Sequence, residues 1–166
     1  MKKMLVAGVL LAATVAAAAQ KAPQAGQPMS TDGFHVSTPP ELKKQSTELL
    51  EQAAKSDSGS VSVTLEKYPT HFMMINARTK SGGGELHEHW ADIFVVLDGE
   101  ATVVTGGHLS DETVKGDGEH RGTAVVGGTS VVVHKGDIVQ VAAGTPHQTI
   151  VAPGKFSVYY VIKIKQ

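Results

Sequence analysis

From residue 61 onward the chain alternates short apolar runs with turn residues. Val61, Val63 and Leu65 alternate with polar residues, and a period of two is typical of a strand with one buried face. Comparable valine-rich runs recur as far as Ile164, with glycine or proline between them. About eight or nine short strands joined by such turns predict an all-β sandwich or barrel. The dipeptide Asp98-Gly99 favours a type I′ turn, so it predicts a hairpin that returns through Ala101 to Thr105.

The segment before these strands has the pattern of a single helix. Ser37 and Thr38 offer a hydroxyl cap, prolines follow in the first turn, and Glu41 is an early acid. A partial apolar stripe of leucines and alanines continues to Lys55. We therefore expect a short N-terminal α-helix over about residues 40–55, laid on the outside of the strands.

The first residues predict export. Lys2 and Lys3 precede an apolar, alanine-rich stretch, and Ala17-x-Ala19 fits a small-residue cleavage site before Gln20. The apolar stretch has roughly 15 residues, fewer than the ~20 that a membrane-spanning helix needs. We expect a signal peptide over residues 1–19, a periplasmic or secreted location, and no membrane insertion after processing. Residues 20–36, rich in Ala, Gln, Pro and Gly, predict a disordered linker.

Composition limits the remaining classes of function. The chain has 166 residues, which suits a single domain over residues 37–166 with its strands at about 60–165. Lys and Arg total 15 against 16 Asp and Glu, so the chain lacks the basic field that nucleic-acid binding requires. Cysteine is absent, which excludes disulfides and a lipid-modified cleavage site.

The stretch from His87 to Asp92 carries metal-ligand residues into an apolar strand. Residues two apart on a strand share a face, so we expect His87 and His89 to project together. Neutral histidine is the commonest metal ligand. Asp92 joins them only if Trp90-Ala91 forms a bulge, because three residues along a straight strand lead to the opposite face. Taken alone, a His-x-His pair is more often an ordinary polar pair.

A second stretch, Gly136 to Gln148, runs through a turn, an alternating strand and a tight turn to a third histidine, His147. Together the two stretches resemble the cupin family, whose motifs are G-x5-H-x-H-x3-4-E-x6-G and G-x5-P-x-G-x2-H-x3-N. The six-residue spacing from Asp92 to Gly99 is kept. Four positions depart from the motifs, with Asp92 for glutamate after a shorter spacer, Ala142 for proline, Val151 for asparagine and Ser81 for the opening glycine.

This resemblance implies a single cupin jelly-roll barrel, a double-stranded β-helix. It also implies one divalent transition metal (Fe, Mn, Ni, Co, Cu or Zn) bound inside the barrel, with His87, His89, Asp92 and His147 as ligands. Asp92 has an alternative role, since its shorter side chain can instead hydrogen-bond a ligating histidine.

Two functions follow from the resemblance. The first is a metalloenzyme acting on an oxygen-rich small molecule by lyase, isomerase or oxygenase chemistry. The second is a non-catalytic protein that captures a sugar or small acid. A homodimer is compatible with the family, although no residue pattern requires it, and the sequence names no catalytic residue.

Two segments supply candidates for contact with the small molecule. Trp90 either forms a wall of the pocket or covers the expected bulge. Residues 106–122 are polar and without period, so we expect a loop without regular secondary structure. Either this loop folds over the barrel mouth, where His120 and Arg121 contact the ligand, or it is a mobile surface loop.

Overall fold

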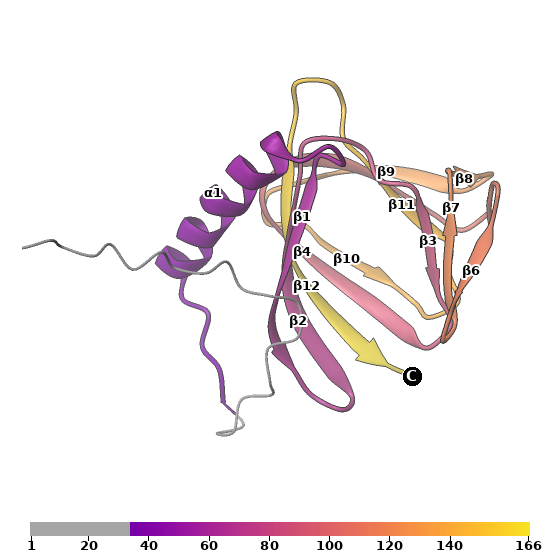
Figure 1. The fold of residues 1–166 in the computed structure, drawn as a ribbon, viewed down its shortest axis with the longest axis horizontal. Coiled ribbons are helices and arrows are strands. Elements are labelled where there is room, and N and C mark those ends of the chain that lie inside the picture. The colour runs from indigo at the N-terminus through magenta and orange to yellow at the C-terminus, as the bar shows by residue number, and fades with distance from the viewer. Residues whose placement is uncertain (1–33) are drawn as a thin grey trace, which may run out of the picture.

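The computed structural model describes residues 34–166, and Figure 1 shows one helix beside a curled arrangement of strands. The predicted signal peptide and most of the predicted linker lie outside the described residues. The elements are α1 (Pro39–Lys55), β1 (Ser60–Lys67), β2 (His71–Arg78), β3 (Gly84–His87), β4 (Trp90–Thr105), β5 (His108–Leu109), β6 (Thr113–Gly116), β7 (Glu119–Gly122), β8 (Val125–Val126), β9 (Thr129–His134), β10 (Ile138–Val141), β11 (His147–Ile150) and β12 (Ser157–Lys165).

The long strand β4 belongs to two sheets. Its first half pairs with β12 and β10, and β12 continues through β2 to β1. Its second half pairs with β9 and β11, and β11 continues through β3 and β7 to β6. We call these the first and the second sheet. All pairings are antiparallel, and the two-sheet order confirms the predicted all-β jelly-roll barrel with an N-terminal helix.

The helix α1 covers the outer face of the first sheet (Figure 1). At its start, the backbone N–H and the hydroxyl of Thr38 donate to Glu41 Oε2 at 3.0 and 2.7 Å. Leu49 and Ala53 are buried against strand residues of β2 and β12. Within residues 34–166, no helix combines the length and the apolar character needed to cross a bilayer.

The main core lies between the two sheets. It is made of inward-facing side chains of β4, β9, β10 and β12, with Val151 beside them: Phe94, Val96, Ala101, Val103, Val133, Val141, Val151, Tyr159 and Val161. Most of these are valines, which pack well on pleated strands. The core fills one part of the interior, and a cavity occupies another.

The predicted hairpin at Asp98-Gly99 is wrong, because β4 runs through it without turning back. Gly99 has φ +76° and lies where β4 passes from one sheet to the other. A hairpin forms instead at Asp117-Gly118, where φ is +47° and +69° and Gly116 pairs with Glu119. These are the positive φ angles that a two-residue type I′ turn needs. The dipeptide predicts the conformation, but the neighbouring strands decide whether the chain reverses.

The expectation of an irregular loop over residues 106–122 is also wrong. The segment contains β5, β6 and β7, and β7 pairs with β3 in the second sheet. These strands show no alternation of apolar and polar residues in the sequence, because every residue of β6 is exposed and every residue of β7 is partly buried. The segment therefore forms part of the barrel wall.

Candidate metal centre

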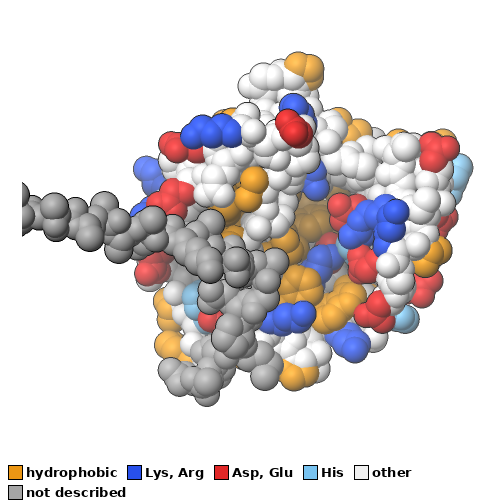
Figure 2. All heavy atoms as spheres, viewed as in Figure 1, with side chains coloured by type: hydrophobic (Ala, Val, Ile, Leu, Met, Phe, Trp, Pro, Cys, Tyr) orange, Lys and Arg blue, Asp and Glu red, His pale blue; other side chains and the backbone are white. Residues whose placement is uncertain are grey.

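A cavity of about 500 Å³ opens between the two sheets, and Figure 2 shows the hollow with apolar and charged side chains inside it. Its walls come from β2, β4 and β12 on one side and from β3, β7 and β11 on the other. Charges of both signs line it, four acidic and four basic side chains: Glu85, Asp92, Asp117, Glu119, Lys67, Arg78, Arg121 and Lys163. Two buried histidines, His87 and His147, complete the polar part of the lining.

His87 is held in place through its Nδ1 atom. Its Nδ1 lies 2.8 and 2.7 Å from the two carboxylate oxygens of Glu119, its partner on β7. A carboxylate only accepts hydrogen bonds, so Nδ1 carries a proton, and in the neutral imidazole the lone pair is then on Nε2. His87 is 3% exposed, and its Nε2 is buried without a hydrogen-bond partner among the described residues. This is the arrangement of a ligating histidine oriented by a carboxylate.

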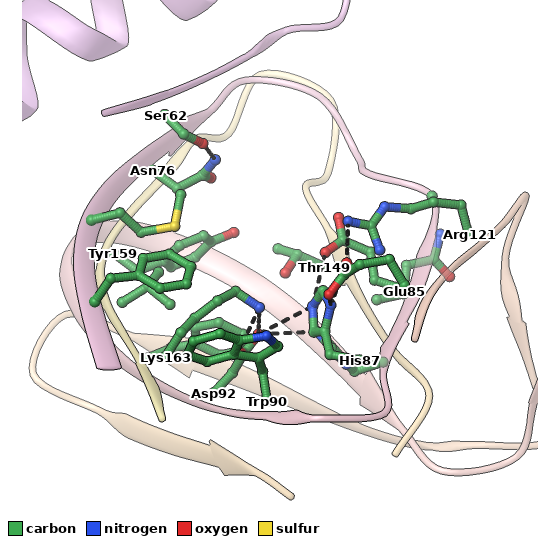
Figure 3. Close-up of a pocket in the computed structure, with 18 of the residues that line it drawn as sticks. Ser62, Asn76, Glu85, His87, Trp90, Asp92, Arg121, Thr149, Tyr159 and Lys163 are labelled. Carbon is green, nitrogen blue, oxygen red and sulfur yellow. Dashed lines mark hydrogen bonds and ion pairs between the residues drawn. The ribbon is translucent and has the colours of Figure 1, made fainter. Parts of the chain in front are cut away.

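His147 is oriented in the same way. Its Nδ1 lies 3.1 Å from the backbone carbonyl of Thr145, which fixes the proton on Nδ1. Its Nε2 lies 3.5 Å from Asp92 Oδ2. The rings of His87 and His147 are 5.3 Å apart and both line the same cavity, where Figure 3 shows His87 beside Glu85.

Glu85 supplies an oxygen next to these nitrogens. It lies two residues before His87 on β3 and pairs across the sheet with His147. One ligand atom from each of Glu85, His87 and His147 lies within 4.8 Å of the others. Burial alone would raise the pKa of Glu85, but the adjacent His87 imidazole and the positive charge of Arg121 lower it to about 2. Glu85 is thus ionised, as a metal ligand must be.

Asp92 lies beside both histidines but is bound to a lysine. It is 2% exposed, and its Oδ2 is 3.5 Å from Nε2 of His87 and of His147. Lys163 Nζ donates to its Oδ1 and Oδ2 at 2.6 and 2.9 Å. Burial would raise the pKa of Asp92, but the nearby His147 imidazole and the charge of Lys163 lower it.

The structure does not bring His89 to the other predicted ligands. The side chain is 49% exposed, and its Nε2 lies 3.9 Å from Glu88 on the surface. The reason is local: β3 ends at His87, residues 88 and 89 form a bend, and β4 begins at Trp90. The strand alternation that would place His87 and His89 on one face is therefore interrupted between them.

Of the three residues predicted to contact the small molecule, Trp90 and Arg121 line the cavity and His120 does not. Trp90 packs edge-to-face on Phe72, with ring centroids 5.3 Å apart. Arg121 donates to Glu119 Oε2 at 2.9 Å. His120 instead bonds Glu88 and Glu112, and these two carboxylates raise its pKa.

Glu85 was missed although the sequence contained a signal for it. The cupin motif allows three or four residues between its second histidine and its acid, whereas His89 and Asp92 are separated by only two. Moving the motif back by two residues places Glu85 and His87 in the His-x-His positions, with four residues before Asp92. Glu119 and Lys163 had no comparable signal, because they reach the site only through strand pairing.

Comparisons with known proteins found similarity among solved structures alone. No family model matches the chain, and no curated protein sequence matches it. Solved structures that resemble it include the cupin domain of Cnp3 from Schizosaccharomyces pombe (12% identity, TM-score 0.49, 64% of this chain and 65% of that one). A double-stranded β-helix protein from Klebsiella pneumoniae matches with 14% identity and TM-score 0.48, over 66% of this chain and 79% of that one. A predicted oxalate decarboxylase from Thermotoga maritima matches with 14% identity and TM-score 0.48, over 64% and 81%.

The match to Cnp3 spans less than two thirds of that domain. The jelly-roll barrel of this chain is described from its own two-sheet topology and not from these likenesses.

Proposed function

We propose that the chain binds one divalent transition metal through Glu85, His87 and His147 and acts on an oxygen-rich small molecule in the cavity. The observation that carries this proposal is the orientation of the two histidines. Both have Nδ1 anchored by an acceptor, and both direct an unprotonated Nε2 toward carboxylates in a buried site. A buried histidine nitrogen without a hydrogen-bond partner fits a metal ligand.

The donor set suits a transition metal. Two imidazoles and a carboxylate are borderline ligands that bind Fe(II), Mn(II), Ni(II), Co(II), Cu(II) or Zn(II), whereas Mg²⁺ and Ca²⁺ prefer oxygen alone. When bound, such an ion supplies Lewis-acid polarisation of a coordinated oxygen. The protein's own contribution is to fix the ligands through Glu119 and the Thr145 carbonyl.

The Asp92–Lys163 pair favours an enzyme over a passive binding protein. Asp92 lies 3.5 Å from a nitrogen of each histidine, and Figure 3 shows Asp92 and Lys163 together in the same cavity. A carboxylate and an ammonium in contact can accept and return a proton during reaction. We therefore place lyase or isomerase chemistry, which moves a proton next to a carbonyl or hydroxyl, ahead of oxygenation.

We also propose that the protein is exported to the periplasm or secreted. Lys2 and Lys3, the apolar stretch after them and Ala17-x-Ala19 support this proposal. Mass spectrometry of the exported protein should find an N-terminus near Gln20. An intact Met1 in the soluble protein would contradict export.

The metal proposal is tested by metal content. The mature protein, purified without chelator and without a metal-binding tag, should contain stoichiometric transition metal by elemental analysis. Glu85→Gln and His147→Gln should lose this metal, because each removes a ligand atom. His89→Gln is the matched control and should keep it, since His89 lies outside the cavity.

Two results would overturn the proposal. The first is a wild-type protein that remains metal-free after incubation with each of the six ions. The second is the opposite pattern among the variants, with metal lost from His89→Gln and kept by Glu85→Gln. Circular dichroism of each variant separates the loss of a ligand from a failure to fold.

A further inference from the structure

The inner face of the first sheet presents three rows of side chains to the cavity. The row nearest the histidines contains Lys163 and Asp92, which pair across β12 and β4. The far row contains Asn76 and Tyr159, which pair across β2 and β12. Tyr159 and Lys163 are four residues apart on one strand, so the two polar rows are separated by roughly 14 Å along β12.

The far row holds polar atoms that lack hydrogen bonds of normal geometry. Asn76 Nδ2 donates to Ser62 Oγ at 2.6 Å and to Ser60 Oγ at 3.2 Å, which uses its donor end. Its Oδ1 and the Tyr159 hydroxyl are buried and make no hydrogen bond of normal distance and angle among the described residues, although the Thr149 and Ser157 side chains lie near the tyrosine oxygen. Asn76 is 7% exposed and Tyr159 4%. Buried polar atoms are normally hydrogen-bonded, so two neighbouring exceptions in a cavity wall indicate a place for a ligand group.

The chemistry of the two atoms selects the group. Asn76 Oδ1 only accepts a hydrogen bond, whereas the Tyr159 hydroxyl both donates and accepts. A ligand hydroxyl can donate to the first and accept from the second. A ligand carboxylate has no proton to donate to Asn76 Oδ1, and its negative charge would be repelled by the partial negative charge of that oxygen. Arg78, which also lines the cavity, already faces Glu85 at 3.8 Å.

The middle row is apolar. Met74, Val161 and Phe94 pair in register across β2, β12 and β4 and line the cavity between the two polar rows. The ring of Phe94 lies 5.7 Å from the ring of Tyr159 and 6.1 Å from that of His147. A ligand that reaches from the histidines to Tyr159 must therefore cross a hydrocarbon surface, where a polar segment would lose its hydrogen bonds to water.

We propose that Asn76 and Tyr159 form a distal subsite that hydrogen-bonds a hydroxyl group at the far end of a ligand with a hydrocarbon middle, as in a hydroxyphenyl-alkanoic acid. The inference rests on the proposed function for the end of the ligand that faces Glu85, His87 and His147. The distal subsite itself depends only on the first sheet.

The test uses two probes that differ by one hydroxyl, 3-(4-hydroxyphenyl)propanoate and 3-phenylpropanoate. Binding to the metal-loaded protein is measured by calorimetry and by the fluorescence of Trp90, which is the only tryptophan and lines the cavity. The hydroxylated probe should bind about 5–10-fold more tightly, the usual effect of one or two hydrogen bonds. In Tyr159→Phe this preference should fall while the affinity for 3-phenylpropanoate is unchanged.

Tyr160→Phe is the matched control. Tyr160 is the next residue of β12 and packs against the outer cluster under α1, so its change should leave the preference intact. Tyr159→Phe should fold, since it removes only a hydroxyl that makes no hydrogen bond of normal geometry. Equal affinity for both probes, no binding of either at millimolar concentration, or a preference that survives in Tyr159→Phe would each overturn the subsite.

Metal analysis of the same samples keeps the two proposals apart. If the wild-type protein holds its metal but binds both probes equally, the distal subsite alone is refuted. A preference for the hydroxylated probe in a protein that takes up no metal supports the subsite and refutes the proposed metal centre.

Discussion

Lys163 donates both of its short contacts, 2.6 and 2.9 Å, to the carboxylate of Asp92, its direct partner across β12 and β4. The aspartate side chain is 3% exposed and the lysine 13%. The ammonium thus balances a buried carboxylate that also lies 3.5 Å from two histidine nitrogens. This ion pair holds Asp92 next to the three proposed metal ligands and occupies both of its carboxylate oxygens.

Lys163→Met should destabilise the metal-free protein. The substitution leaves the Asp92 carboxylate buried without its cation, and breaking a buried pair in this way costs about 3 kcal/mol. Urea unfolding of the two metal-free proteins measures the difference. Metal binding should become tighter in the variant, because the freed Asp92 can add an oxygen to the set. Lys165→Met, exposed at the end of the same strand, is the control. Unchanged stability and metal affinity would show that the pair has neither role.

Glu119→Gln should weaken metal binding while keeping the three ligands in place. A neutral amide holds His87 Nδ1 less firmly than a carboxylate and makes the ring a poorer donor, so affinity should fall about 10–100-fold. Competition with a chromogenic chelator measures this change. Glu112→Gln is the control, since Glu112 bonds the imidazole of His120, which does not line the cavity. Equal affinity in both variants would refute the orienting role of Glu119.

The sequence predicted the barrel because its signals are local. Alternation in β1 and the cap of α1 depend only on neighbouring residues, and both elements form as expected. The motif ending at His147 likewise led to a buried residue of the site. Where a local rule failed, at His89 and at Gly99, the cause was a bend or a bridging strand set by the rest of the fold.

The contacts that complete the site could not be predicted in this way. Glu119 is 32 residues from His87, and Lys163 is 71 residues from Asp92. Each meets its partner because their strands are neighbours in register. Nothing in the sequence around either residue indicates that register, so the structure was needed to find them.

Glu85 should make the stability of the metal-free protein depend on pH in the acid range. Its pKa lies at about 2 in the fold against an ordinary 4.5, so its ionised form stabilises the folded state. This stabilisation is complete when the pH is above the ordinary pKa of 4.5. It is lost as the pH falls toward the pKa of about 2 that Glu85 has in the folded protein. Between these limits Glu85→Gln should lose less stability than the wild type, by on the order of 2 kcal/mol. Urea unfolding at several pH values measures this. Glu88 is half-exposed on the surface, so the stability of Glu88→Gln should fall with pH as that of the wild type does. If the stability of Glu85→Gln also fell in parallel with the wild type, the prediction would be contradicted.

The passage of β4 between the two sheets should depend on glycine at position 99. A Cβ there would lie 2.1 Å from the carbonyl oxygen of Phe156, on a backbone with φ +76°. Gly99→Ala therefore combines a left-handed backbone with a steric clash, and it should reduce the free energy of unfolding by about 3 kcal/mol. Gly154→Ala is the control, because φ is +77° there and no atom lies within 4 Å of the added carbon. It should cost only about 1 kcal/mol. Equal losses in the two variants would mean that β4 can shift away from Phe156, and that the close approach is not what directs the strand from the first sheet into the second.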